Sequence, residues 1–165
     1  MFKTLEREYG KFTVDLFANQ KNHKVDRFYS KWWHESSCGV NAFSFDWESE
    51  HALIVPPVAQ IVRAFRKCSV TKMSGVLVIP VWDKGRFWPL ITPDGCHGTE
   101  SVQHMKLFYA KMRKVKGMKN NLMTDKRQAY LAILIHGKPE NSFQPNFIRS
   151  SCIRVAFGQT CSQFK

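Results

Sequence analysis

Residues 52–80 read ALIVPPVAQIVRAFRKCSVTKMSGVLVIP, and this stretch decides the fold. The apolar run 52–55 is typical of a buried strand, and Pro56-Pro57 ends it because proline has no backbone N–H to donate. A helix is expected from Pro57 to about Lys67, with an apolar face formed by Val58, Ile61, Val62 and Phe65. The continuous apolar run 75–80 is typical of a central parallel strand. Together these elements predict a strand–helix–strand crossover.

The flanking segments extend this unit on both sides. Strands are expected over 12–18 and 40–47 before it, and over 129–135 and 152–157 after it. A short helix or turn is expected over 86–91, and the stretch 92–126 is interpreted as a loop that admits one helix over 105–112. We therefore predict one α/β domain over 1–165, in three layers, with a mostly parallel sheet and an antiparallel C-terminal edge. Its parts are a core over about 10–91, a basic loop region over 92–127 and closing strands over 128–158.

Positive charge is concentrated in the second half of the chain. The formal net charge is +12, and residues 100–165 hold 12 Lys and Arg against 3 Asp and Glu. Most of these cations are Lys106, Lys111, Arg113, Lys114, Lys116, Lys119, Lys126 and Arg127. A patch of this density attracts phosphate backbones through counterion release, without reading sequence. Contact with DNA or RNA and a merely solvated basic linker both stay open.

Composition sets limits on location and metal content. No run of about 18 apolar residues is present, and the charged start MFKTLEREYGKF lacks the apolar core of a signal peptide. The five cysteines form no C-x-x-C pair, so a zinc framework is not expected and the thiols should be free. We expect an intracellular protein, in the nucleus or the cytoplasm, that is not secreted, contacts no membrane and holds no metal.

Four ordered segments carry a resemblance to a known family. They are Val14-Asp-Leu-Phe-Ala-Asn19 with Asn22, Lys24 and Tyr29; Asn41-Ala-Phe-Ser-Phe-Asp-Trp47; Val55-Pro-Pro-Val58; and Val76-Leu-Val-Ile-Pro-Val-Trp82 with Phe87-Trp88. They resemble the methyltransferase-like module that lies between the reverse transcriptase/RNase H and the tyrosine recombinase of DIRS-type retrotransposon polyproteins. That module is in turn similar to the phage-type Dam DNA adenine methyltransferases. The resemblance covers about residues 10–91 and implies a Rossmann-like, methyltransferase-type fold.

The resemblance places the family's catalytic tetrad at Val55, Pro56, Pro57 and Val58. In the family an Asn- or Asp-Pro-Pro-Tyr/Phe tetrad accepts hydrogen bonds from the amine of the flipped adenine and stacks a ring on the base. Val55 cannot accept a hydrogen bond, and Val58 offers no stacking face, which is typically worth ~1–3 kcal/mol per base. The prolines that shape the turn remain. We expect that base methylation has been lost, unless an aromatic ring such as that of Trp82 replaces the missing one.

The cofactor half of the pattern is better preserved. The resemblance implies an S-adenosylmethionine site at the carboxyl ends of the strands. Its matching positions are Asp15, Phe17, Ala18, Asn22 and Asp46. Asp15 is expected at the end of a buried strand, where a hydrogen-bonded structural carboxylate is the competing interpretation. No glycine-rich loop is apparent, so we expect no cofactor, or S-adenosylmethionine if the ancestral pocket survives. The tryptophans Trp47, Trp82 and Trp88 are expected in the core.

Two other functions remain alternatives. An active S-adenosylmethionine-dependent DNA methyltransferase would need the tetrad's lost groups to be supplied from elsewhere. An RNase H-like nuclease would hold two metal ions with carboxylates, for which Asp15, Asp46, Glu48 and Glu50 are available. We favour a retroelement-derived, catalytically inactive DNA adenine methyltransferase-like domain that acts as a nucleic-acid-binding or scaffold module. Its expected partners are DNA or RNA and other domains of a retroelement polyprotein.

Overall fold

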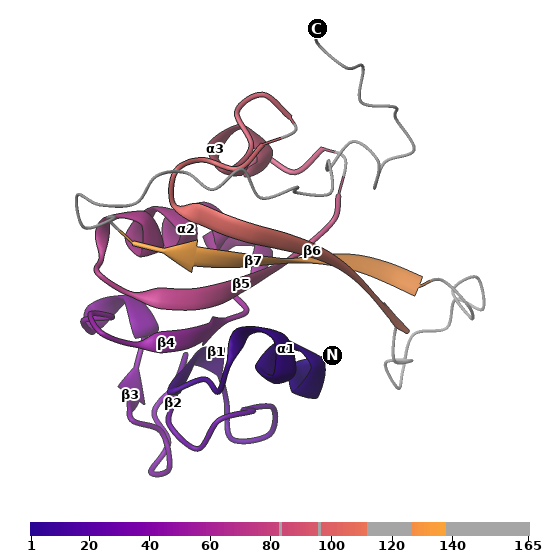
Figure 1. The fold of residues 1–165 in the computed structure, drawn as a ribbon. Helices are drawn as coiled ribbons and strands as arrows, with labels where there is room; N and C mark the ends of the chain where they lie inside the picture. Colours follow the sequence, from indigo (N-terminus) through magenta and orange to yellow (C-terminus); the bar gives the residue numbers. More distant parts are fainter. Residues whose placement is uncertain (83, 96, 112–126, 138–165) are drawn as a thin grey trace, which may run out of the picture.

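One mixed sheet runs through the part of the chain that the computed structural model describes, residues 1–82, 84–95, 97–111 and 127–137 (Figure 1). Its strands are β1 (Val14–Ala18), β2 (Phe28–Ser30), β3 (Gly39–Val40), β4 (His51–Ile54), β5 (Ser74–Pro80), β6 (Val102–Lys111) and β7 (Arg127–His136). They lie in the order β3-β2-β1-β4-β5-β7-β6. Strands β1 to β5 are parallel, whereas β7 is antiparallel to both β5 and β6. The predicted α/β fold with an antiparallel edge is confirmed.

The strand–helix–strand unit forms as predicted, with one shift in the helix. A 3-10 turn over Val58–Gln60 precedes the α-helix α2, which spans Ile61–Val70. This turn rotates the buried face, so that the helix buries Ile61, Ala64, Phe65 and Cys68. Val58, expected on that face, is instead 44% exposed. The first turn after the two prolines is therefore not part of the core.

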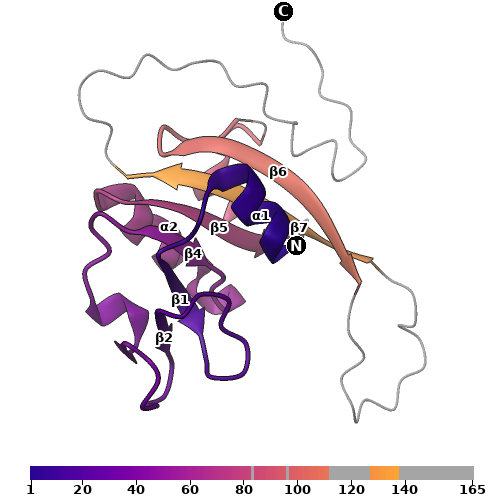
Figure 2. The same ribbon diagram turned by 60° about the horizontal axis from the view of Figure 1, so that its bottom comes forward.

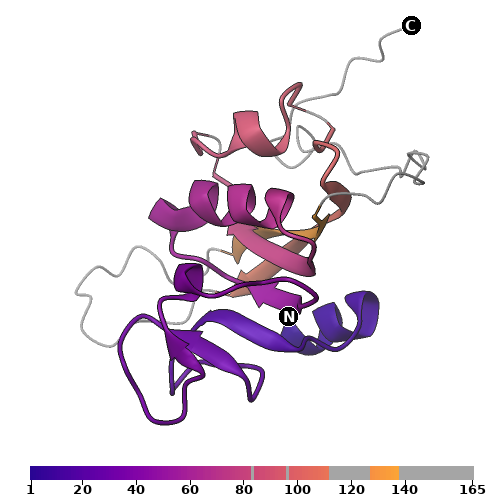
Figure 3. The same ribbon diagram turned by 90° about the vertical axis from the view of Figure 1, so that its left-hand side faces the viewer.

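Helices cover both faces of the sheet and make the three layers (Figures 2 and 3). On one face, α2 and the short helix α3 (Trp88–Ile91) pack against alternate strand residues such as Leu16, Ile54 and Ile79. On the other face, the helix α1 (Phe2–Tyr9) packs through Leu5 against Leu53, Val76 and Val78. None of the helices in the described ranges is long and apolar enough to cross a membrane.

Helix α1 precedes the predicted core in the sequence. Its side chains contact β6, the outer strand of the sheet beyond β7. The Tyr9 hydroxyl lies 2.8 Å from His104 Nδ1, and Lys106 Nζ lies 2.7 Å from Glu8 Oε2. Leu5 is 1% exposed. Gly10 ends the helix with a φ of 92°, a conformation that glycine adopts without strain. The buried core therefore begins before residue 10.

The strand predicted over 40–47 is wrong. The strand β3 ends at Val40, and a 3-10 turn follows over Ala42–Ser44. Asn41 breaks the strand because it adopts a φ of 62° and its side chain accepts a hydrogen bond from Phe43 N. Trp47 then folds back into the core, where its Nε1 donates to Ala42 O at 2.8 Å.

The helix predicted over 105–112 is also wrong, and so is the loop prediction where β6 forms. Residues 92–95 and 97–101 are turns and loop as predicted, and 112–126 lie outside the described residues. Residues 102–111 form β6, which pairs with β7 along its length, with Met105 opposite Ile133 and Leu107 opposite Leu131. A strand at the edge of a sheet carries mixed polar and apolar residues, so its pattern resembles a loop or an irregular helix. The strand predicted over 152–157 lies outside the described residues. Among the cysteines within them, Cys38 and Cys68 are free thiols.

Replacing Leu5 should release α1 from the sheet. We expect Leu5→Ala to lower the free energy of unfolding by about 2–4 kcal/mol, because it leaves a cavity beneath a helix with few other buried contacts. Urea denaturation measures this loss. The matched control is Arg7→Ala on the exposed side of the same helix, which should cost less than about 0.5 kcal/mol. Equal losses in the two variants would show that α1 does not depend on this contact.

Candidate functional site

The parallel strands bring several chain segments together at one edge of the sheet. Because β1, β2, β4 and β5 run in the same direction, the residues that follow Ala18, Ser30, Ile54 and Pro80 all lie at the carboxyl edge. Ligands of open α/β sheets bind outside this edge. The residues predicted to form the site should therefore lie together at this edge of the sheet.

A cavity of about 580 Å³ lies between this edge and α1. Its walls are Met1, Phe2, Leu5, Asp15, Phe17, Ala18, Asn22, Lys24, Leu53, Val55 and Val78. Four of the five predicted cofactor positions, Asp15, Phe17, Ala18 and Asn22, thus meet the first tetrad position, Val55, in one cavity. Its volume is within the range of about 300–1,000 Å³ that small-molecule sites occupy.

Asp15 is the buried charge of this cavity. It is 4% exposed, and Lys24 N donates a hydrogen bond to its Oδ2 at 3.1 Å. Burial raises the pKa of this carboxyl, and the backbone N–H groups of Lys24 and Phe17 oppose the rise. Asp15 is the second residue of β1 rather than its last, which corrects the predicted position. The sequence left two interpretations of Asp15 open, a hydrogen-bonded structural carboxylate and a carboxylate at a ligand site. In the structure Asp15 is hydrogen-bonded and also lines the cavity.

A tight turn after β1 carries Asn22 and Lys24 into the cavity wall. Asn19 and Asn22 hold this turn, since Asn19 Oδ1 accepts from Lys21 N at 2.8 Å and Asn22 Oδ1 accepts from Asn19 N at 2.6 Å. The next residue, His23, stacks on Phe28 with ring centroids 4.5 Å apart. These contacts explain why the loop returns to the cavity without a glycine-rich sequence.

The loop after β4 carries the two prolines of the predicted tetrad between two valines. Pro56 is buried, and Pro57 begins the 3-10 turn with a φ of −53°. Val55 and Val58 are 40% and 44% exposed, so both side chains lie at the surface of the edge. Neither contributes a hydrogen-bond donor, an acceptor or an aromatic face there.

Asp46 is not brought to the cavity. Its side chain is exposed and its Oδ1 accepts a hydrogen bond from Glu48 N at 3.1 Å, which makes it a turn residue. Trp47 beside it is fully buried, as predicted. Trp82 is not in the core: it is 46% exposed at the carboxyl edge, directly after β5. Trp88 is partly buried, and its Nε1 donates to Trp82 O at 2.6 Å.

The structure describes only part of the predicted basic segment. Lys106 is ion-paired with Glu8, so it belongs to the attachment of α1. Lys111 and Arg127 lie opposite each other at the end of the β6–β7 hairpin. Because Tyr130 pairs with Pro80, the last residue of β5, Arg127 lies three residues beyond the end of that strand, at the carboxyl edge. Arg113, Lys114, Lys116, Lys119 and Lys126 lie outside the described residues.

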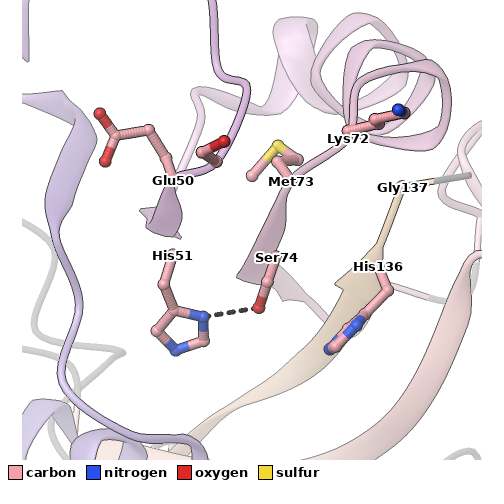
Figure 4. A pocket seen from close by; sticks show the side chains of 8 residues that line it. Glu50, His51, Lys72, Met73, Ser74, His136 and Gly137 are labelled. Carbon is pink, nitrogen blue, oxygen red and sulfur yellow. Dashed lines mark hydrogen bonds between the residues drawn. The ribbon is translucent and has the colours of Figure 1, made fainter.

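A second cavity of about 340 Å³ lies at the opposite, amino edge of the strands (Figure 4). His51 Nδ1 lies 2.6 Å from Ser74 Oγ, and Phe12 stacks on the imidazole. His51 Nε2 is buried and has no hydrogen-bond partner among the described residues. Burial, followed by the charge of His51, lowers the pKa of His136 across this cavity. A serine–histidine pair alone, with no carboxylate oriented toward the histidine, has no third group to activate it.

The carboxylates of the nuclease alternative do not converge. Glu50 lies at the amino edge, where it accepts hydrogen bonds from Thr13 and Arg27, while Asp15 faces the carboxyl-edge cavity. Asp46 and Glu48 are exposed turn residues. Within the described ranges, no group of three His, Cys, Asp or Glu side chains could hold a metal ion. The arrangement does not provide a two-metal site.

Several residues that line the carboxyl-edge cavity were not predicted from the sequence. Leu53 and Val78 line it because they point to the sheet face opposite α2, which strand alternation could have shown. Phe2 and Leu5 come from α1, whose apolar residues at positions 2, 5 and 9 already follow a helical period. Only tertiary structure places this helix over the cavity.

Comparison with known proteins agrees with the fold. The family model for DNA N-6-adenine-methyltransferase (Dam) matches residues 1–90, which include α1, the five parallel strands and every residue that lines the carboxyl-edge cavity. No curated protein matches the chain. The match covers more than half of the 165 residues. The chain belongs to the DNA N-6-adenine-methyltransferase (Dam) family.

Proposed function

We propose that this domain binds nucleic acid at the carboxyl edge of its sheet and no longer methylates adenine. The observation that carries the proposal is the state of the loop at 55–58. The buried Pro56 preserves the turn, while Val55 and Val58 stand exposed where the reaction needs a hydrogen-bond acceptor and a stacking ring. Loss of an acceptor that acts mainly in the transition state typically costs about 100-fold or more in rate.

The cavity beside this loop fits the family's cofactor in size and charge. S-adenosylmethionine supplies an electrophilic methyl group and carries positive charge on its sulfonium and amino groups. Asp15 would hold a positive group, Asn22 offers donors and an acceptor, and Phe17, Leu53 and Val78 provide apolar walls. Burying a carboxylate is costly without a partner, so a cationic ligand gives Asp15 a physical reason to be there. We infer that cofactor binding has outlasted catalysis.

Charge at the same edge supports binding of nucleic acid. The strands β6 and β7 place the backbones of Lys111 and Arg127 beyond the end of β5. The sequence between these two residues, which lies outside the described residues, contains Arg113, Lys114, Lys116, Lys119 and Lys126 against Asp125. Cations in such number bind phosphates irrespective of base sequence. A strand of DNA or RNA at this hairpin would pass the mouth of the cavity.

We also propose an origin in a DIRS-type retroelement, because the four ordered segments of the sequence resemble its methyltransferase-like module. On that origin, the domain's protein partners would be the neighbouring polyprotein domains. Genomic sequence around the gene tests this directly. A reverse transcriptase with RNase H upstream and a tyrosine recombinase downstream are expected, and their absence would contradict the retroelement origin.

Restoring a hydrogen-bond acceptor and an aromatic ring to the tetrad should restore methyl transfer to DNA. Wild-type protein should bind S-adenosylmethionine in calorimetry yet transfer no labelled methyl group to unmethylated DNA. The double variant Val55→Asn/Val58→Tyr should regain measurable transfer, because it returns the acceptor and the ring to a loop that has kept its shape. The variant Val55→Ala/Val58→Ala is the matched control. Methylation by the wild type would refute the proposal, and bound cofactor without regained transfer would show that the damage extends beyond these two positions.

Binding of nucleic acid should depend steeply on salt. Neutralising Lys111, Arg113, Lys114 and Lys116 to Gln should reduce the slope of log affinity against log salt by up to about one unit per lost phosphate contact. The control neutralises Arg7, Lys11, Arg66 and Lys72, which are exposed and are not part of the β6–β7 hairpin. Fluorescence anisotropy with a labelled duplex measures both. Equal effects of the two sets would mean that net charge alone is responsible.

Asp15→Asn should change stability and S-adenosylmethionine binding in opposite directions. Because folding raises the pKa of Asp15, the folded protein holds this proton more tightly than the unfolded chain. The carboxyl therefore stabilises the fold below its unfolded pKa near 3.9, and this contribution is lost as the pH rises through the folded pKa. The variant should melt at a higher temperature than wild type at pH 7 and at about the same temperature at pH 3, and it should bind S-adenosylmethionine more weakly. A variant that is less stable at pH 7 would assign Asp15 a purely structural role.

A further inference from the structure

Two consecutive tryptophans are exposed in the loop that follows β2. Trp32 is 73% exposed and Trp33 is 80% exposed, the two most exposed large apolar side chains in the described ranges. Tryptophan is usually well buried, and a large exposed apolar surface commonly marks a site of interaction. The fold does not use either ring for packing in its core.

The position of this pair relates it to the cavity. Ser30, the last residue of β2, pairs with Ala18, the last residue of β1, and Ala18 lines the cavity at the carboxyl edge. Trp32 and Trp33 follow Ser30 by two and three residues, so at most roughly 11 Å of extended chain separates them from the end of β2. They therefore lie on one side of the Val55–Val58 loop, and Trp82, 46% exposed after β5, lies on the other.

The loop that carries the pair is held by hydrogen bonds. Ser30 Oγ donates to Trp32 O, and Ser37 N and Ser37 Oγ donate to His34 O at 3.0 Å and 2.8 Å. Cys38 N donates to Phe28 O at 2.8 Å, which closes the loop onto β2. The two rings are thus presented from an ordered turn, so that little conformational entropy would be lost when they bind a ligand.

Charge around the rings favours an anionic partner with flat aromatic groups. Lys31 Nζ lies 4.9 Å from the centre of the Trp32 ring, and the exposed Lys21 and Lys24 follow the neighbouring strand β1 at the same edge. Aromatic rings beside lysines form the combination with which proteins bind single-stranded nucleic acid, by stacking on bases and neutralising phosphates. A surface that docks another protein would not need this accompanying positive charge.

We propose that Trp32 and Trp33 form a stacking surface for unpaired bases of a nucleic-acid strand lying along the carboxyl edge. This inference rests on the proposed function, and it names the form of nucleic acid that the site prefers. An unpaired base has both faces free to stack, whereas the bases inside a duplex already stack on one another. The domain should therefore bind a single strand more tightly than a duplex of equal length.

The test compares the full chain with three variants by fluorescence anisotropy. The probes are a labelled oligothymidylate of about 20 nucleotides, long enough for one such domain, and a duplex of the same length. Trp32→Ala/Trp33→Ala should weaken binding to the single strand about tenfold or more, with little change for the duplex and an unchanged salt slope. Trp32→Phe/Trp33→Phe should retain most of the affinity because it keeps stacking rings. Val70→Ala, at a residue 66% exposed on α2, is the control for an exposed apolar side chain elsewhere.

The outcomes distinguish this inference from the proposed function. If wild type binds both probes with a steep salt dependence and the Ala variant binds the single strand equally well, the stacking surface is refuted and the proposed function stands. If wild type binds neither probe, both are refuted. If the Ala variant keeps its affinity but changes its oligomeric state in light scattering, the tryptophans serve protein contacts and the inference is again overturned. Recovery by the Phe variant, with a melting temperature equal to wild type, supports stacking.

Discussion

The hydrogen bonding of β4 between two parallel neighbours, β1 and β5, is the constraint on which the rest of the structure depends. Asp15 pairs with Leu53, and Leu53 pairs with Val76, so the three strands keep one register across the middle of the sheet. Parallel strands need a crossover between them, and α2 supplies it on one face. The opposite face is left for α1, and the cavity forms beneath that helix. Because all three strands end at one edge, residues far apart in the chain reach the same cavity without any long loop.

If the domain has lost methylation as we propose, this arrangement would explain how the catalytic residues could change while the fold persisted. Val55 and Val58 are 40% and 44% exposed at the edge and neither belongs to the buried core, so their replacement leaves the core packing unchanged. Pro56 is buried and stops β4, so its loss would disturb the crossover that orders the sheet. Stability therefore acts on Pro56, which is buried, whereas Pro57 is exposed and shapes the turn by its fixed φ. A chain relieved of selection for methylation would be expected to diverge in just this pattern. Asp15 differs from both kinds of position, because burial raises the pKa of its carboxyl and makes the charged form costly, so packing alone gives no reason to keep it.

The centre of the fold could be predicted from the sequence because its signals are local. Uninterrupted apolar runs, a proline pair and a helical period define β4, α2 and β5, and the cofactor positions of β1 follow from their pattern. The edges could not be predicted in this way. Whether Val102–Lys111 forms a strand depends on the partner β7, which lies fifteen residues further along the chain. Asp46 matched the pattern, yet the left-handed Asn41 and the burial of Trp47 turn its segment away from the cavity. The sequence alone would place Trp32 and Trp33 in the core, because tryptophan is usually buried. Their exposure is unusual only in a structure whose core forms without them.

The strand β6 also bears on how copies of this domain behave toward one another. Among the described residues it is the outer strand of the sheet beyond β7, ten residues long, with one row of backbone groups facing away from the sheet. A long outer strand of this kind is a ready template for pairing with another chain and so for aggregation. The strand at the other side, β3, has only two residues and offers little to pair with. Lys106 places a positive charge on this strand, where it is ion-paired with Glu8 of α1, and charged side chains on an outer strand disfavour such pairing. The attachment of α1 to β6 through Lys106 would thus also hinder edge-to-edge pairing between copies of the domain.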